Sequence, residues 1–195
     1  MPTPELRTYS TGDLDNNVYI LVDPETNESV LFDAPGDAQQ ILKQLEGTRL
    51  KYILMTHADY DHIHALSEVQ RATGAPVAVH SAEIDRLPHR PDFTLHDGQT
   101  LRFGNVELQA MHTPGHTPGG MSFVTDGMVF AGDTLFPGGP GNTERPISDF
   151  HQIIESIRGK LFTLPDDTTV YPGHGKPTTI GAEKPHLQEW VNRGW

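Results

Sequence analysis

The amino-acid sequence predicts an α/β fold in which two mixed β-sheets pack together and carry helices on their outer faces. The first observation is the order of the segments, which runs from β-rich through alternating strands and helices to β-rich again, and closes with helix, strand and helix. The second is the length of 195 residues, enough for a core that needs no disulfides. The third is that the chain contains no linker, repeat or low-complexity tract, so we expect a single domain over residues 1–195.

The first third of the chain predicts three strands and a helix. The strands are expected at Leu6–Tyr9, Asn17–Val22 and Ser29–Phe32. A polar turn at 24–27 pairs the second strand with the third. The following helix begins at about Asp37, has apolar residues on one face and ends at Gly47.

The next segment alternates strands and helices. Tyr52–Met55 is an apolar run typical of a buried strand, and Val77–Val79 is a second one. Between them, a helix with an apolar face ends near Gly74. A short helix is expected after Ser81.

Strands separated by tight turns dominate the chain from Leu101 onward. They are expected at Leu101–Phe103, Val106–Met111, Met121–Val124 and Met128–Ala131, with two-residue hairpin turns at 104–105 and 126–127. A long Gly- and Pro-rich loop at Phe136–Pro146 comes next. The remaining elements are a helix at Ser148–Lys160, a strand at Thr168–Tyr171 and a helix at Pro185–Trp195.

The composition excludes several classes of function. A formal net charge of −12 argues against binding to nucleic-acid phosphates, which requires clustered Lys and Arg. No apolar run is long enough for a transmembrane helix, and the segment 1–5 does not resemble a signal peptide, so a cytoplasmic protein is expected. With no cysteine in the chain, any metal site must use His, Asp and Glu. The expected partner is a small-molecule substrate, whereas the oligomeric state is open.

The segment Thr56–His62 is the most concentrated group of metal-binding side chains in the sequence. It contains His57, Asp59, Asp61 and His62 directly after the apolar strand. Imidazole and carboxylate groups bind zinc, iron or manganese. Loops at strand ends also commonly present functional groups. We therefore expect a metal site here, with further ligands from downstream loops.

Four more loops after predicted strands carry groups that can bind metals. They are the loops around His80, at His112–Thr117, at Gly132–Thr134 and at Pro172–Gly175. A lone histidine in a loop is usually solvated or caps a helix. That interpretation applies to His64, His80, His89, His96, His151 and His186. Asp133 alone could equally be a turn residue, but several strand ends with such groups, and glycines beside them, favour a shared site.

The ordered motifs THADYDH at 56–62, HTPGH at 112–116, GDT at 132–134 and PGHG at 172–175 resemble the metallo-β-lactamase-fold hydrolases. Within that superfamily the chain is most similar to the hydroxyacylglutathione hydrolase (glyoxalase II)-like branch. The resemblance implies an αββα sandwich with a binuclear metal site at one edge of the sheets. It implies little about the substrate, because this fold hosts many chemistries.

The family pattern assigns His57 and His116 to a first metal ion, and Asp61, His62 and His174 to a second. Asp133 bridges the two ions. His112 matches no ligand of the pattern and is expected to brace its loop. The resemblance thus implies two divalent ions, with zinc expected and iron or manganese as alternatives.

Asp59 departs from the pattern, because the family usually has a second histidine for the first metal here. The flavodiiron proteins, which hold iron, have Glu at this position. Asp59 could ligate, which would favour iron or manganese and weaken the ion's effect on bound water. Alternatively, its shorter side chain fails to reach and the first site is weak or empty. Both alternatives remain open at this point.

The expected reaction is the attack of a metal-bound hydroxide on a thioester, ester or lactam carbonyl. Asp61 would orient or deprotonate the nucleophile while it coordinates the second ion. The chain has no cysteine and no Gly-x-Ser-x-Gly motif, so a covalent mechanism has little support.

Three residues are candidates for substrate contacts. Tyr60 either faces the substrate or packs against the neighbouring sheet. Phe136 begins the long loop that could form one wall of the cleft, and Arg145 near its end is either an anion contact or a solvated arginine. The chain ends soon after Thr179, whereas larger glyoxalase II enzymes continue into a helical region that binds glutathione, so the pattern leaves glutathione recognition open.

Two other functions compete with hydrolysis. The first is iron-dependent oxygen chemistry, as in the persulfide dioxygenases that share this fold, which an anionic Asp59 would favour. The second is a non-catalytic binding protein that has lost the first metal. Metal stoichiometry separates the hydrolase, which would hold two metals per chain, from the binder, which would hold none.

Overall fold

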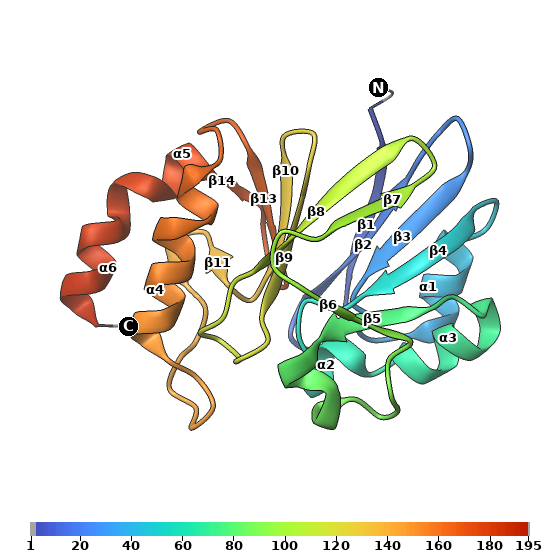
Figure 1. Cartoon of the computed structure of the whole chain (residues 1–195), viewed down its shortest axis with the longest axis horizontal. Coiled ribbons are helices and arrows are strands. Elements are labelled where there is room, and N and C mark those ends of the chain that lie inside the picture. Colours follow the sequence, from blue (N-terminus) through green and yellow to red (C-terminus); the bar gives the residue numbers. More distant parts are fainter. Residues whose placement is uncertain (1–2, 195) are drawn as a thin grey trace.

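In the computed structural model, which describes residues 3–194, two six-stranded sheets lie face to face between two groups of helices (Figure 1). Helices α1 to α3 cover the outer face of the first sheet, and α4 to α6 cover the outer face of the second. Each sheet contains both parallel and antiparallel pairs. The predicted αββα sandwich of two mixed sheets is confirmed.

The first sheet has its strands in sequence order, β1 to β6. Their bounds are Glu5–Thr11, Asn16–Val22, Glu28–Phe32, Arg49–Leu54, Val77–His80 and Phe93–Leu95. The predicted antiparallel pairing of the second and third strands is present, with Val22 opposite Ser29. From β3 onward the pairs are parallel. The carboxyl ends of β4 and β5 therefore lie at the same edge of the sheet.

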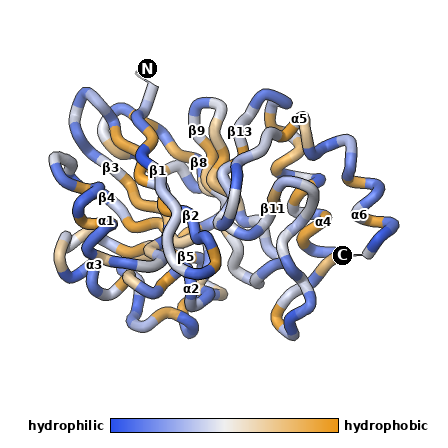
Figure 2. The backbone as a smooth tube through the Cα atoms, turned by 180° about the vertical axis from the view of Figure 1, so that it is seen from behind, coloured by the Kyte–Doolittle hydropathy of each residue, from blue (hydrophilic) through white to orange (hydrophobic). Residues whose placement is uncertain are grey.

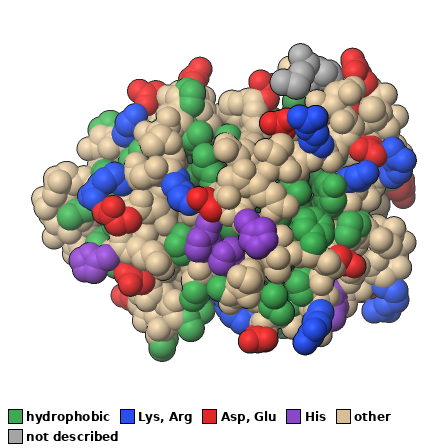
Figure 3. Space-filling view, viewed as in Figure 1, with side chains coloured by type: hydrophobic (Ala, Val, Ile, Leu, Met, Phe, Trp, Pro, Cys, Tyr) green, Lys and Arg blue, Asp and Glu red, His purple; other side chains and the backbone are tan. Residues whose placement is uncertain are grey.

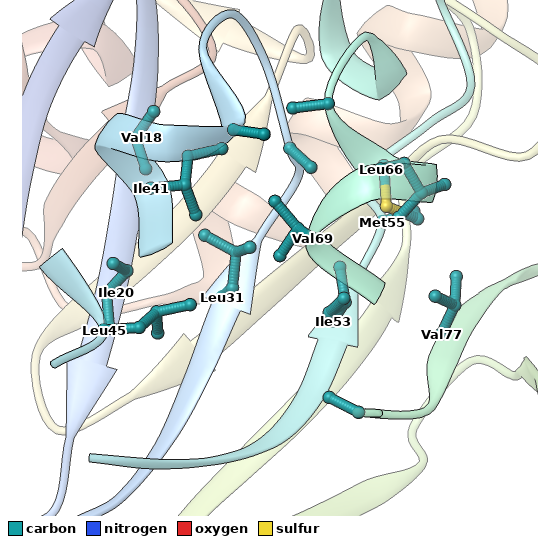
Figure 4. Packing of buried hydrophobic residues seen from close by; sticks show 14 of the residues in the cluster. Val18, Ile20, Leu31, Ile41, Leu45, Ile53, Met55, Leu66, Val69 and Val77 are labelled. Carbon is teal, nitrogen blue, oxygen red and sulfur yellow. The ribbon is translucent and has the colours of Figure 1, made fainter. Parts of the chain in front are cut away.

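The first half of the chain contains three α-helices. They are α1 at Ala38–Gln44, α2 at Tyr60–Ile63 and α3 at Leu66–Thr73. Figure 4 shows how Ile41 and Val69 from the helices meet Leu31 and Ile53 from the sheet. The segment after Ser81 is a 3₁₀ helix, Ser81–Arg86. The single helix expected after the metal-binding loop is instead divided into α2 and α3.

The second sheet has the order β14-β13-β10-β9-β8-β7. Its strands are β7 at Thr100–Phe103, β8 at Val106–His112, β9 at Met121–Thr125, β10 at Met128–Gly132, β13 at Thr169–Pro172 and β14 at Thr178–Thr179. Both predicted hairpin turns are present, since Phe103 pairs with Val106 and Thr125 with Met128. β10 and β13 run parallel, which places their carboxyl ends side by side.

The last third of the chain supplies the outer helices of the second sheet. They are α4 at Phe150–Gly159, α5 at Ile180–Glu183 and α6 at Leu187–Arg193. The loop predicted at 136–146 overlaps a small hairpin, β11 at Leu135–Phe136 and β12 at Gly139–Pro140. The predicted end of the last helix, Trp195, lies outside the described residues. Within residues 3–194, no helix has the length and apolar character needed to cross a bilayer.

The core between the sheets is rich in aromatic side chains. The rings of Phe32 and Phe130, from opposite sheets, stack with centroids 4.1 Å apart, and Phe123 lies 5.4 Å from Phe32. In Figure 2, where the backbone is coloured by hydropathy, the strands of both sheets include hydrophobic stretches, drawn in orange. Because both sheets contribute to one apolar layer, this layer fixes how the loops at their ends face each other.

Replacing Phe32 by alanine is expected to lower the free energy of unfolding by about 3–5 kcal/mol, because it removes a fully buried ring and leaves a cavity between the sheets. Urea denaturation measures the change. As a matched control, Ile147→Ala removes a side chain that is 44% exposed and should cost no more than about 0.5 kcal/mol. Equal losses in the two variants would contradict the described core.

Candidate metal centre

Four strand ends bring the predicted ligands together. The segment with His57 to His62 follows β4, His116 follows β8, Asp133 follows β10 and His174 follows β13. Gly132 and Pro172 are paired in the parallel ladder of β10 and β13. Asp133 and His174, which follow them, therefore lie at the same edge of the second sheet. The backbone amide of Asn17 donates to the Gly173 carbonyl at 2.8 Å, which ties the first sheet to this edge of the second.

The ligand atoms form two adjoining groups. In the second-ion group, the Nε2 atoms of His62 and His174 are 3.2 Å apart, and Asp61 Oδ2 lies 3.6 Å and 3.3 Å from them. In the first-ion group, Asp59 Oδ2 lies 3.4 Å from His57 Nε2 and 3.1 Å from His116 Nε2.

Asp133 faces both groups. Its Oδ1 is 3.4 Å from His62 Nε2, and its Oδ2 is 3.4 Å from His174 Nε2 and 3.5 Å from His116 Nε2. The structure therefore places each of the seven predicted ligands in one cluster: His57, Asp59, Asp61, His62, His116, Asp133 and His174.

These spacings suit a metal ion. Two ligands of a tetrahedral zinc ion lie about 3.3 Å apart, because each is about 2.0–2.1 Å from the ion. Two ligand atoms, His57 Nε2 and Asp133 Oδ1, are buried and have no hydrogen-bond partner. An unpaired buried polar atom is costly. A cation bound beside His62 would satisfy Asp133 Oδ1, so the donor set of the second-ion group fits a divalent metal.

Every histidine of the cluster is anchored through its other ring nitrogen. The Nδ1 atom lies 2.9 Å from Thr56 Oγ1 in His57 and 2.9 Å from Asp33 Oδ2 in His62. In His116 and His174 it lies 2.8 Å and 2.7 Å from backbone carbonyl oxygens. When Nδ1–H donates to these oxygens, the lone pair of each Nε2 is directed into the cluster.

The close approach of two loops requires glycine. A Cβ on Gly173 would lie 2.2 Å from Asp133 Oδ1 and 2.7 Å from His62 Cε1. Gly132 adopts φ = +49°, and a Cβ there would lie 2.6 Å from the Thr56 side chain. The glycines of the GDT and PGHG motifs thus make room for the ligands.

Nearby histidines keep the carboxylates of Asp133 and Asp61 ionised. Burial would raise the pKa of Asp133, but the charge of His62 and hydrogen bonds from His174 and His62 hold the pKa well below its usual range. Asp61 likewise has a lowered pKa: burial opposes the shift, and hydrogen bonds from His174 and Asn16 and the charge of His62 produce it. Both side chains are therefore anionic acceptors at neutral pH.

The histidines differ in protonation. Burial lowers the pKa of His174, but hydrogen bonds to Asp133 and Asp61 outweigh it and raise that pKa to about 10. The pKa of His57 is lowered, first by burial and then by the charge of His62. His57 is therefore neutral at pH 7, and a neutral imidazole with a free Nε2 is the form that binds metals.

Asp59 is held by two arginines. Arg86 Nη2 donates to its Oδ1, and Arg145 Nη1 donates to its Oδ2 at 2.5 Å. The Arg145 side chain is 35% exposed but also engages Asp59 and His116, so its role as an anion contact stays a prediction. Because Asp59 Oδ2 also faces both first-group imidazoles, its side chain reaches the first-ion group despite being shorter than histidine.

A cleft of about 620 Å³ lies beside the second-ion group. Asp61 lines it together with Tyr60, His64, Leu14 and Asn16. Tyr60 is 74% exposed and meets His64 edge to face, so the alternative that it packs against the neighbouring sheet is wrong. Phe136 does not line this cleft; its ring lies 6.3 Å from that of His174.

A family model of the metallo-β-lactamase superfamily matches residues 11–174. The chain belongs to the metallo-β-lactamase superfamily. Hydroxyacylglutathione hydrolase GloC of Haemophilus influenzae is 32% identical over 190 residues, covering 86% of this chain and 89% of GloC. The human mitochondrial persulfide dioxygenase ETHE1 is 36% identical over 170 residues, covering 86% of this chain but 63% of ETHE1.

Two solved structures of this superfamily are also similar. BLEG-1, described as a B3 metallo-β-lactamase, has a TM-score of 0.88 and 31% identity, and the match covers 94% of this chain and 98% of BLEG-1. TTHA1623, solved in a di-iron-bound form, has a TM-score of 0.79 and 31% identity, with 91% and 96% covered. Similar members of the superfamily thus differ in chemistry and include one that holds two iron ions.

Several residues that shape this superfamily site were not singled out by sequence. Asp33 accepts hydrogen bonds from the Thr56 backbone amide and hydroxyl, both at 2.7 Å, as well as facing His62. Glu83 is fully buried and accepts from the backbone amides of Ala58 and Gly119 at 3.1 Å and 2.9 Å. Asp33 stands in the DAPG segment at a strand end, which is a detectable signal, whereas nothing near Glu83 or Arg86 marks them.

The remaining histidines lie outside the two ligand groups. His80 and His112 stack with centroids 4.0 Å apart and planes 11° apart. His112 Nε2 also lies 2.9 Å from the Pro118 carbonyl oxygen, within the loop that delivers His116. Histidine side chains are visible near the middle of the face in Figure 3, whereas His57 and His62 are buried.

Asp33→Asn is expected to weaken metal binding by about 10–100-fold, because the amide cannot reproduce the carboxylate that fixes the His62 tautomer. Asparagine tolerates the left-handed backbone at this position, φ = +57°, so the fold should remain. Zinc titration against a chelating indicator measures the affinity. Asp126→Asn is the control, since this exposed turn residue also has positive φ. Unchanged affinity in Asp33→Asn would contradict the role given to Asp33.

Proposed function

We propose that the protein is a metal-dependent hydrolase of thioester, ester or lactam carbonyls. The observation that carries the proposal is the convergence of four strand-end loops on one cluster of imidazoles and carboxylates, beside an open cleft. The ionised carboxylate of Asp61 both faces the cluster and lines that cleft. A hydrolase needs this combination of a metal centre, a base and access for the substrate.

The chain offers defined positions for divalent metal. Asp61, His62, Asp133 and His174 would hold an ion in the second group, and His57, Asp59 and His116 face Asp133 from the first group. A divalent ion bound here lowers the pKa of water and polarises a substrate carbonyl. Zinc suits the nitrogen and oxygen donors, and iron or manganese suits a site richer in carboxylates.

Asp61 is the proposed general base. Its side chain is 28% exposed, which gives it contact with the cleft and with the ligand cluster. Asn16 Nδ2 donates to Asp61 Oδ2 at 2.9 Å and fixes the orientation of the carboxylate. In this position Asp61 can orient an attacking water and accept its proton.

A thioester is the favoured substrate class. The match to GloC covers 89% of that hydroxyacylglutathione hydrolase, so the two proteins share nearly their whole length. Tyr60, which lines the cleft with Asp61, and Phe136, whose ring lies near that of His174, are the proposed apolar contacts for the acyl or thiol part of the substrate.

Persulfide oxidation is the second candidate. It is favoured by the 36% identity to human ETHE1 and by the similar structure that holds two irons. The match covers 63% of the length of human ETHE1.

The deciding experiment assays protein loaded separately with zinc, iron and manganese on four substrates. These are a hydroxyacyl glutathione thioester, an aryl ester, a β-lactam and glutathione persulfide with dissolved oxygen. We expect hydrolysis of the thioester with metal present. Oxygen consumption on the persulfide by the iron form alone would favour the dioxygenase. No turnover by any metal-loaded form would favour a non-catalytic binding protein.

A further inference from the structure

The Arg145 guanidinium lies where the first-ion ligands converge. Its Nη2 donates to His116 Nε2 at 3.0 Å and to the His116 carbonyl oxygen at 3.0 Å, while Nη1 donates to Asp59 Oδ2 at 2.5 Å. The neutral imidazole has a single in-plane lone pair on Nε2, because Nδ1–H donates to the Asn142 carbonyl at 2.8 Å. That lone pair can accept from Arg145 or bind a metal ion, but it cannot do both.

Asp59 is fixed in this arrangement from its other side. Arg86 donates to Asp59 Oδ1, and its Nη1 donates to Glu83 Oε2 at 2.5 Å. Glu83 is itself anchored by two backbone amides and is fully buried. Both oxygens of Asp59 are therefore engaged by arginines, and one arginine is braced by a rigid buried carboxylate.

The second-ion group contrasts with the first. Asp61, His62 and His174 direct their ligand atoms at one another and at Asp133. The additional hydrogen bonds of Asp61 and His174 go to the neutral groups Asn16 and the Leu14 carbonyl. These contacts involve no arginine or lysine, in contrast with the first-ion group, so the ligand atoms can converge on a metal ion.

We propose that the guanidinium of Arg145 replaces the first metal ion, so that each chain binds one divalent ion through Asp61, His62, Asp133 and His174. The proposal rests on the metal-dependent function argued above and specifies its stoichiometry. Asp59 is then the counter-ion of Arg145 rather than a ligand. This chain differs in that respect from its di-iron-bound relative TTHA1623.

The charges of the cluster agree with one ion. Of the three carboxylates among the ligand groups, Asp59 is paired with Arg145, which leaves the negative charges of Asp61 and Asp133 for a metal ion to neutralise. One divalent ion neutralises them, and Arg86 is balanced by Glu83. A second divalent ion would give the cluster a net positive charge. It would also lie next to the Arg145 guanidinium, and repulsion between two cations in contact is unfavourable.

The test is the zinc content of dialysed protein, measured by elemental analysis and by calorimetric titration of the metal-free form. We expect one equivalent for the wild type and for Arg145→Lys, which keeps the charge. Arg145→Ala and the double variant Asp59→His/Arg145→Ala should bind two equivalents, because the lone pair of His116 becomes available beside that of His57. Arg102→Ala, which removes an exposed arginine paired with Glu107, is the matched control and should bind one.

Two equivalents bound to the wild type, or one equivalent bound to both alanine-containing variants, would overturn the proposal. Circular dichroism and thermal unfolding of each variant establish that it is folded. Hydrolysis measured on the same samples separates this inference from the proposed function. A wild type with one ion and no hydrolysis would refute the function alone, whereas a hydrolytic wild type with two ions would refute the inference alone.

Discussion

Asp133→Asn is expected to abolish metal retention and to reduce turnover by at least about 10³-fold, since the metal contributes several kcal/mol of transition-state stabilisation. Among the described residues, Asp133 is the carboxylate that faces His62, His174 and His116 together, and the charge of His62 and hydrogen bonds from His174 and His62 lower its pKa against the effect of burial. The amide keeps the shape but removes the negative charge. Elemental analysis and thioester hydrolysis measure the two effects.

The control for this substitution is Asp167→Asn, which makes the same change at an exposed residue before β13. It should leave metal content and turnover unchanged. Near-wild-type metal content in Asp133→Asn would show that Asp133 is not a ligand.

Asp61→Asn is expected to lower kcat by about 10²–10⁴-fold in protein that still carries metal, because the carboxylate serves as the proton acceptor. The amide can still receive the hydrogen bond from Asn16, so the loop should keep its position. The assay is done at saturating metal, which separates loss of the base from loss of affinity.

Asp13→Asn is the matched control, because Asp13 lines the same cleft as Asp61 but has no ligand contact in the cluster. Its kcat should stay within about twofold of the wild type, as surface changes usually have small effects. A metal-loaded Asp61→Asn enzyme with unchanged kcat would exclude Asp61 as the base.

The layers of the fold could be predicted from local sequence patterns, because both buried strands and hairpin turns have short-range signals. The turns at 104–105 and 126–127 contain glycine between apolar runs, and both form hairpins. In contrast, β6, β11, β12 and β14 have only two or three residues and no alternating pattern. Such strands are defined by tertiary pairing, which no local segment reveals.

The arginines around Asp59 could not be predicted from sequence. Arg86 and Arg145 lie 27 and 86 residues from Asp59, and no periodicity marks either of them. Tyr60 was ambiguous for another reason. The short helix α2 directs His62 into the cluster, which leaves Tyr60 pointing to solvent, and the orientation of one helical turn depends on where it begins.

The dependence of hydrolysis on metal tests the central claim most directly. Protein treated with a chelator and dialysed should lose thioester hydrolysis, and one added equivalent of divalent metal per chain should restore it. Loss and recovery should follow metal occupancy of Asp61, His62, Asp133 and His174. If metal-free protein hydrolyses the thioester as fast as metal-loaded protein, the account of this site as a metallohydrolase centre is wrong.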